Sequence, residues 1–203
     1  WIFAVGGGRD RGLHELWARD EERLCGLLPP NLVLLQAPAE LEPRLPGCCA
    51  ARQRSVRECA PEGAVRLLPD LSLCRPEENP GLGWVLAGSG AAAAAQPPYG
   101  AFRLAGTGLC AAATAAEALL RHGPNVVLTH GPASGRWDAG LGDGQLAEAL
   151  GRCGTVRVHV FGLVSEAYGV DFCDGCTYIN ASICTPLCLP AREPIMFDLL
   201  EER

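Results

Sequence analysis

The sequence predicts an α/β protein, in which short buried strands alternate with amphipathic helices. Short apolar runs recur along the chain and end at glycine or proline, as buried strands do where they meet a turn. Longer stretches between them repeat apolar residues at helical spacing, and this alternation is typical of α/β proteins. An apolar content of 48% and a charged content of 20% fit a globular chain of 203 residues with one sizeable core.

The first predicted element is a strand, WIFAV at residues 1–5, which ends at a run of three glycines. Apolar residues at helical spacing predict a helix over 11–25, and Gly26 ends that helix. A second short strand is predicted over 31–36. These elements begin the α/β alternation.

The next part of the chain is irregular. Residues 37–82 are rich in proline, so we expect a loop-rich insertion with a helix near 50–58 and a strand near 65–68. GWVLA at 83–87 predicts another strand. The alanine-rich stretch after it is placed in a second loop-rich insertion at 88–100, because a single helical turn is marginal on its own.

Helices and strands alternate more regularly from there. GLCAAATAAEALLRH at 108–122 predicts a helix, which Gly123 ends. NVVLTH at 125–130 predicts a buried strand. Asp143 can cap a helix over 144–152, because an Asp side chain at the N-cap accepts hydrogen bonds from backbone N–H groups.

The C-terminal part contributes three predicted strands, at 155–161, 177–181 and 195–199. In the last of them apolar residues alternate, as they do in a strand with one buried face. The chain shows no internal repeat. We therefore predict a single domain over residues 1–203.

The charge distribution and the apolar runs exclude some classes of function. The net charge is −6 and the basic residues are scattered, which argues against a nucleic-acid surface. No apolar stretch reaches the roughly 18–20 residues that span a bilayer, so we expect no membrane segment. Residues 1–5 lack the pattern of a signal peptide, and we interpret the chain as beginning partway into a domain or lacking its first exon.

Eleven cysteines are distributed along the chain. Disulfide frameworks are typical of small secreted domains, and this chain is large enough to fold without one, so we favour reduced thiols in a cytoplasmic protein. The spacing Cys173-x-x-Cys176 and Cys184-x-x-x-Cys188 leaves a zinc site with four thiolates open as an alternative. A disulfide or redox role for these four residues also stays open.

Three segments in the C-terminal half carry a family likeness: VVLTHGP at 126–132, HVFGLVSEAYG at 159–169 and TYINASICT at 177–185. In this order they resemble the C-terminal part of a calcineurin-like metallophosphoesterase, of the subgroup called metallophosphoesterase domain-containing proteins. WIFAVGGGRD, GWVLAGS and PIMFDL resemble further strands of that family. The resemblance covers nearly all of this chain and about the C-terminal two-thirds of the family's domain.

The resemblance implies an α-β-β-α sandwich of two mixed sheets, of which the N-terminal part is missing here. It also implies two divalent metals, Mn, Fe, Zn or Mg, at the carboxyl ends of the central strands. Two such cations roughly 3.5–4 Å apart bind a phosphate ester and generate hydroxide from water. In the family, five blocks supply the ligands: Asp-x-His, Gly-Asp, Gly-Asn-His, a lone His after a strand, and Gly-His-x-His.

The first two blocks have no counterpart in this sequence, and the third is altered. Gly6 keeps the family's glycine, but Gly7 stands at the metal-binding Asn and Gly8 at the catalytic His. Arg9 stands at the position of an acidic residue. Because backbone N–H groups before a helix can bind an anion, Gly6, Gly7, Gly8 and Arg9 remain candidates for phosphate binding.

The fourth block is kept and the fifth is altered. His130, in THGP, matches the lone metal-binding His, either as a remnant ligand or as a histidine hydrogen-bonded at the end of a strand. Gly162 keeps the turn of the fifth block, but Leu163 and Ser165 stand at its two histidines, and Glu166 keeps the acid that follows. One histidine does not hold a divalent ion, because catalytic zinc normally takes three protein ligands.

The sequence therefore predicts a degenerate metallophosphoesterase with no catalytic residues and no bound cofactor. It would act by binding a nucleotide phosphate or a protein partner. The alternative is an active phosphodiesterase or phosphohydrolase, if upstream residues complete a site with His130, Glu166 and one of the carboxylates Asp138, Asp143 or Asp171. Leu163 alone would not decide between them, but Ser165, Gly7 and Gly8 together favour the degenerate form.

Overall fold

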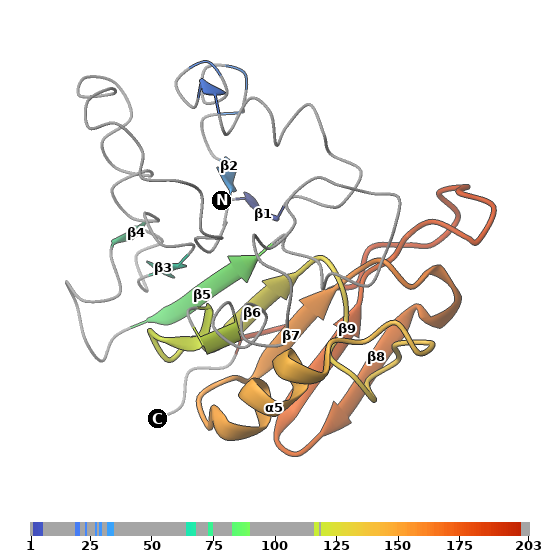
Figure 1. The fold of residues 1–203 in the computed structure, drawn as a ribbon. Coiled ribbons are helices and arrows are strands. Elements are labelled where there is room, and N and C mark those ends of the chain that lie inside the picture. The colour runs from blue at the N-terminus through green and yellow to red at the C-terminus, as the bar shows by residue number, and fades with distance from the viewer. Residues whose placement is uncertain are drawn as a thin grey trace.

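A computed structural model of the chain describes residues 2–5, 19–20, 23, 27, 29, 32–34, 64–67, 73–74, 83–89, 116–117 and 119–199. The central element is a seven-stranded mixed sheet with the order β4-β3-β5-β6-β7-β9-β8 (Figure 1). Its strands are β3 Ala64–Leu67, β4 Leu73–Cys74, β5 Trp84–Ser89, β6 Val126–Thr129, β7 Val158–Phe161, β8 Gly169–Cys173 and β9 Cys176–Asn180. The described part is thus α/β, with a sheet and few helices.

The middle four strands of this sheet are parallel. β5 pairs with β6, β6 with β7, and β7 with β9, all in the same direction, while β3, β4 and β8 run antiparallel to their neighbours. The carboxyl ends of β5, β6, β7 and β9 therefore lie along one edge of the sheet, where α/β proteins commonly bind ligands.

Apolar side chains cover both faces of the sheet. Neighbouring residues of one strand point to opposite faces, so Val126 belongs to one core cluster and Val127 to the other. The cluster of Val127 packs against α5, Gly144–Arg152, through Leu146 and Leu150. The parallel middle strands are buried on both sides, which explains why they appear in the sequence as continuous apolar runs.

The opposite face is covered by the two ends of the chain. The short strands β1 Ile2–Ala4 and β2 Leu32–Leu34 form a separate two-stranded parallel sheet. Phe3 and Val5 pack against the cluster of Val126, together with Ile195 and Leu199. The second sheet and the C-terminal segment therefore share one face of the large sheet.

Most predicted elements are confirmed within the described residues. The helix over 144–152 has the predicted bounds, and the Asp143 carboxylate accepts hydrogen bonds from the N–H groups of Gln145 and Leu146 at 2.8 and 3.1 Å. The helix near 50–58 lies outside the described residues. Of the helix predicted over 108–122, positions 116, 117, 119 and 120 are helical, whereas positions 121 and 122 already form a turn.

Two predictions are corrected, and one strand was missed. Residues 195–199 do not form a strand, although Ile195 and Leu199 pack on the sheet as their spacing suggested. β5 continues through Ser89, so the loop predicted to begin at residue 88 begins later. Strand β8 was not predicted, because Gly169 and Asp171 are of types that strands disfavour.

β8 and β9 form a tight hairpin. Asp174 and Gly175 connect them with φ angles of 53° and 78°, the pattern of a type I′ turn, which Asp-Gly sequences favour. At the other end of β8, the Trp137 ring lies where a Cβ atom on Gly169 would stand. Only glycine therefore fits under this indole.

In the described part of the chain, no helix is both long enough and apolar enough to cross a membrane.

Candidate functional site

Two of the family-like segments meet at the carboxyl edge of the sheet. His130 directly follows β6, and Gly162 directly follows β7. Because these strands are parallel neighbours, their ends are adjacent, and the Gly162 N–H donates a hydrogen bond to the His130 carbonyl at 3.1 Å. The structure therefore brings together His130 and the turn at 162–166, as the motifs predicted.

The turn after β7 holds Leu163 in a strained conformation. The Val164 N–H donates to the Gly162 carbonyl at 2.8 Å, which closes a three-residue γ-turn around Leu163. The φ angle of Leu163 is 69°, a region that a branched apolar side chain rarely adopts. Leu163 is 38% exposed, and its Cδ2 atom lies 3.3 Å from the position of a Cβ on Gly131. Its side chain thus lies against the THGP loop.

A buried asparagine fixes the far side of this turn. The Asn180 side chain, which is fully buried at the end of β9, donates to the carbonyls of Val164 and Ala167 at 2.8 and 2.7 Å. Its Oδ1 atom accepts from the Ser182 N–H at 3.1 Å. Two hydrogen bonds from this side chain therefore hold residues 164–167, including the 3₁₀ turn Ser165–Ala167, against β9, and the third joins it to Ser182.

The buried side chains of Thr129 and His159 stabilise the THGP loop through hydrogen bonds. The Thr129 hydroxyl donates to the Gly131 carbonyl at 2.6 Å and lies 2.8 Å from His159 Nε2. Since the single hydroxyl proton is used on Gly131, His159 Nε2 is the donor to Thr129. Nδ1 of His159 then carries a buried lone pair, for which the described residues provide no partner. Complete burial lowers the pKa of His159 to about 3, so the ring stays neutral.

The remaining family-site positions supply few metal ligands. Leu163 has no lone pair to donate, and the Ser165 hydroxyl donates to the Glu166 carboxylate at 3.3 Å. His130 is partly buried and makes interactions of its own. Gly6, Gly7, Gly8 and Arg9 lie outside the described residues, so their arrangement relative to His130 stays a prediction.

The carboxylates proposed for a rebuilt metal site are used elsewhere. Asp143 caps α5, Asp171 accepts from the Phe172 N–H at 2.9 Å, and Asp138 accepts from the Gly135 N–H at 3.1 Å. The backbone N–H of Gly135 lowers the pKa of Asp138, so this group serves its own loop. Over the described ranges, no three His, Cys, Asp or Glu residues gather closely enough to hold a metal ion. The residues of this edge that the structure describes therefore do not fit a metal pair.

The four C-terminal cysteines do not form the zinc site that their spacing allowed. Cys173 and Cys176 are partners across the β8–β9 hairpin, whereas Cys184 pairs with Pro190 in an isolated bridge, and Cys188 is exposed. All four are free thiols. Burial raises the pKa of Cys176 to about 11, and a hydrogen bond to Asp174 raises that of Cys173, so both stay protonated at neutral pH.

Sequence reasoning singled out Leu163 and His130, which the structure places at adjacent strand ends, but missed the groups that hold them. Asn180 and Thr129 were included in the family-like segments only as parts of strands. The available signal was a polar residue at the end of an otherwise apolar strand, because such a residue is buried only when it is hydrogen-bonded. His159 was predicted to be packed within its strand, and its complete burial confirms this.

Comparison with known proteins supports the resemblance read from these motifs. No family model matches the chain. The chain is 37% identical over 87 residues to metallophosphoesterase domain-containing protein 1 of Homo sapiens and, equally, of Mus musculus. The match covers 40% of this chain but only 27% of the length of each relative. Part of the chain is thus similar in sequence to metallophosphoesterase domain-containing protein 1.

Proposed function

We propose that this protein is a degenerate metallophosphoesterase, which binds a ligand or a protein partner and does not hydrolyse phosphate esters. The observation that carries the proposal is the turn at 162–166, where Leu163 and Ser165 together stand at the two late histidines of the family's motif. Leu163 lies next to the THGP loop, inside a turn of unusual geometry.

The geometry of this turn supports a site that has lost a metal-binding side chain but has kept its backbone conformation. A γ-turn with positive φ costs free energy, and such strain persists where the surrounding structure enforces it, commonly at functional sites. Here Asn180 and the Gly162–His130 hydrogen bond enforce it. The backbone that would present an imidazole is therefore kept, while the side chain it presents is a hydrocarbon.

The packing of the N-terminal strands supports the fold that the family implies. Phe3 in β1 and Val5 just after β1 pack on the face of the large sheet opposite to α5. We propose that β1 and β2 belong to the second sheet of an α-β-β-α sandwich. The cytoplasmic location expected from the free thiols remains part of this proposal.

The ligand proposed for the former catalytic cleft is a nucleotide phosphate, contacted by the backbone of Gly6, Gly7 and Gly8 and by Arg9. A scaffold without metal ligands can also act by binding a protein partner on its surface. The family's substrates do not transfer to this chain, because function depends on the site and not on the fold.

Metal analysis combined with a hydrolysis assay tests the proposal. The 203-residue chain, equilibrated with Mn²⁺ and desalted, should retain far less than one equivalent of metal and should not cleave bis-p-nitrophenyl phosphate. The Leu163→His/Ser165→His variant is the matched test, since it returns both imidazoles to the turn. It should also fail to cleave the ester, because the Asp-x-His and Gly-Asp blocks have no counterpart in this sequence. Metal retained at about two equivalents by the unmodified chain, with turnover, would overturn the proposal.

The alternative is an active phosphodiesterase whose site is completed by residues outside this sequence. The specific observation in its favour is His130, kept beside the turn at 162–166. In that case His130→Ala should abolish metal-dependent hydrolysis. In the degenerate protein His130→Ala leaves an already absent activity unchanged, whereas ADP should still raise the melting temperature of the chain.

A further inference from the structure

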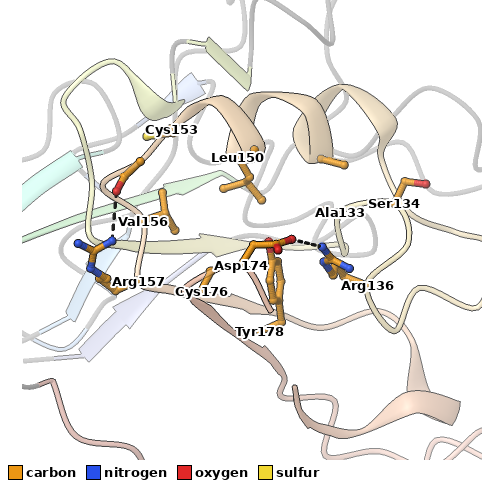
Figure 2. Close-up of a pocket in the computed structure, with 13 residues that line it drawn as sticks. Ala133, Ser134, Arg136, Leu150, Cys153, Val156, Arg157, Asp174, Cys176 and Tyr178 are labelled. Carbon is orange, nitrogen blue, oxygen red and sulfur yellow. Dashed lines mark hydrogen bonds and ion pairs between the residues drawn. The ribbon is translucent and has the colours of Figure 1, made fainter. Parts of the chain in front are cut away.

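A cavity of about 170 Å³ lies under α5, away from the turn at 162–166 (Figure 2). It opens between α5, the loop after β6 and the turn end of the β8–β9 hairpin. Its apolar walls include Ala133, Ala147, Leu150 and Val156, and Cys176 and Tyr178 of β9 also line it. The proposed phosphoesterase ancestry gives this cavity no role.

Two arginines line the cavity on opposite sides (Figure 2). Arg157 donates to the Gly154 carbonyl at 3.1 Å, just beyond the end of α5. Arg136 pairs with Asp174 at 3.1 Å and lies over the Tyr178 ring, with 5.1 Å from its Cζ atom to the ring centroid. Arg136 is thus oriented by an aromatic ring at the wall of the cavity.

The partner of Arg136 is one that a ligand can replace. The Asp174 side chain is 82% exposed, whereas that of Arg136 is 30% exposed. An ion pair with so exposed a carboxylate contributes little to stability, because water solvates both groups. Asp174 gives Arg136 a single contact, through one carboxylate oxygen. A ligand carboxylate that also fills the cavity offers Arg136 a contact to two oxygens, with less water around it.

The size and charge of the cavity define the ligand class. A cavity of about 150 Å³ holds a benzene ring, so the volume here suits a ring of that size. The charged lining comprises two arginines and one aspartate, which leaves a single net positive charge. A monoanion balances that charge, whereas a phosphate dianion exceeds it and meets the Asp174 carboxylate.

We propose that this cavity binds a small aromatic monocarboxylate, with its ring between α5 and β9 and its carboxylate on Arg136. Benzoate is the probe for this class. Benzamide has the same shape without the charge, and inorganic phosphate has the charge without the ring.

Isothermal titration and thermal unfolding of the 203-residue chain test the assignment. Benzoate at about ten times its dissociation constant should raise the melting temperature by about 3–6 °C. Benzamide should bind about tenfold more weakly or worse, because it does not form the charge-assisted contact. Arg136→Met should weaken benzoate to the same degree.

The matched control is Arg192→Met. Arg192 also lies 5.1 Å over a tyrosine ring, that of Tyr168, but it does not line the cavity, so this variant should bind benzoate normally. Ala147→Leu, which fills the cavity and leaves Arg136 in place, should abolish binding. Circular dichroism of each variant confirms that it is folded.

Three results would overturn the proposal: equal affinity for benzamide and benzoate, unchanged benzoate affinity in Arg136→Met, or phosphate binding that benzoate does not displace. An absence of benzoate binding to the unmodified chain at high millimolar concentration would do the same. None of these results bears on the metal and hydrolysis tests, which concern the carboxyl edge of the sheet.

Discussion

Leu163 has a backbone conformation that its own side chain disfavours, and the resulting strain can be measured as a difference in stability between two variants. At an ordinary position alanine is more stable than glycine, by about 0.5–1 kcal/mol. At a φ angle of 69° the order should reverse, because the left-handed region strains every residue with a Cβ atom. We expect Leu163→Gly to be more stable than Leu163→Ala by about 1 kcal/mol in urea unfolding. The usual order would show that the turn relaxes without strain.

His159 should make the stability of the protein depend on pH. Burial lowers the pKa of its folded form to about 3, while the unfolded chain titrates near the ordinary value of 6.5. Its contribution is therefore complete above pH 6.5 and is lost as the pH falls toward 3, at about 1.4 kcal/mol per pH unit. His159→Gln, which keeps a donor for Thr129, should remove this slope from the free energy of unfolding. The same change at the partly buried His122 should leave the slope in place.

At the scale of elements, one side chain joins the turn after β7 to β9. Asn180→Ala removes three hydrogen bonds to buried or partly buried backbone groups, and we expect a loss of about 3 kcal/mol or more in the free energy of unfolding. Asn180→Asp is nearly isosteric but turns a carboxylate oxygen toward two carbonyls. It should be strongly destabilising at pH 7 and partly recover at pH 4, where a protonated acid can donate. Equal stability at both pH values would contradict the proposed role.

The helix α5 depends on its N-cap in a way that the sequence predicted. Asp143→Ala should cost about 1 kcal/mol, while Asp143→Ser should cost less, because serine also accepts from the first turn. Asp171→Ala is the control, since Asp171 bonds only locally in the edge strand among the contacts described for it. Urea unfolding monitored by circular dichroism measures all three. A loss for Asp171→Ala as large as that for Asp143→Ala would argue against a specific cap.

Elements with a local cause could be predicted from the sequence, and elements with a distant cause could not. The helix 144–152 has its cap and its apolar face within the same stretch, and the middle strands are continuous apolar runs. β8 forms because the Asp-Gly turn folds it onto β9, although Gly169 and Asp171 are of types that strands disfavour. Residues 195–199 have the alternation of a strand but no partner strand among the described residues, and periodicity alone does not supply one.

The candidate site likewise has parts that local sequence predicts and parts that depend on distant residues. Motif spacing places His130 and Leu163 at adjacent strand ends, because parallel strands bring their carboxyl ends to one edge. The hydrogen bonds that shape the turn come from Asn180, 16 residues after Val164, and no local pattern encodes them. The cavity under α5 combines the loop after β6 with the β8–β9 hairpin. It therefore became visible only with the tertiary structure.

At the scale of the molecule, both core clusters lie on the same seven-stranded sheet, and this predicts one cooperative unfolding transition. Val126 and Val127 are neighbours in β6, are 2% and 0% exposed, and belong to opposite clusters. Val126→Ala and Val127→Ala should each cost about 1–3 kcal/mol, because each removes buried methyl groups. Each should lower the same urea midpoint without changing its slope, by circular dichroism and by tryptophan fluorescence alike. Two transitions, with each substitution shifting only one, would show that the faces fold as separate units and would contradict a single domain.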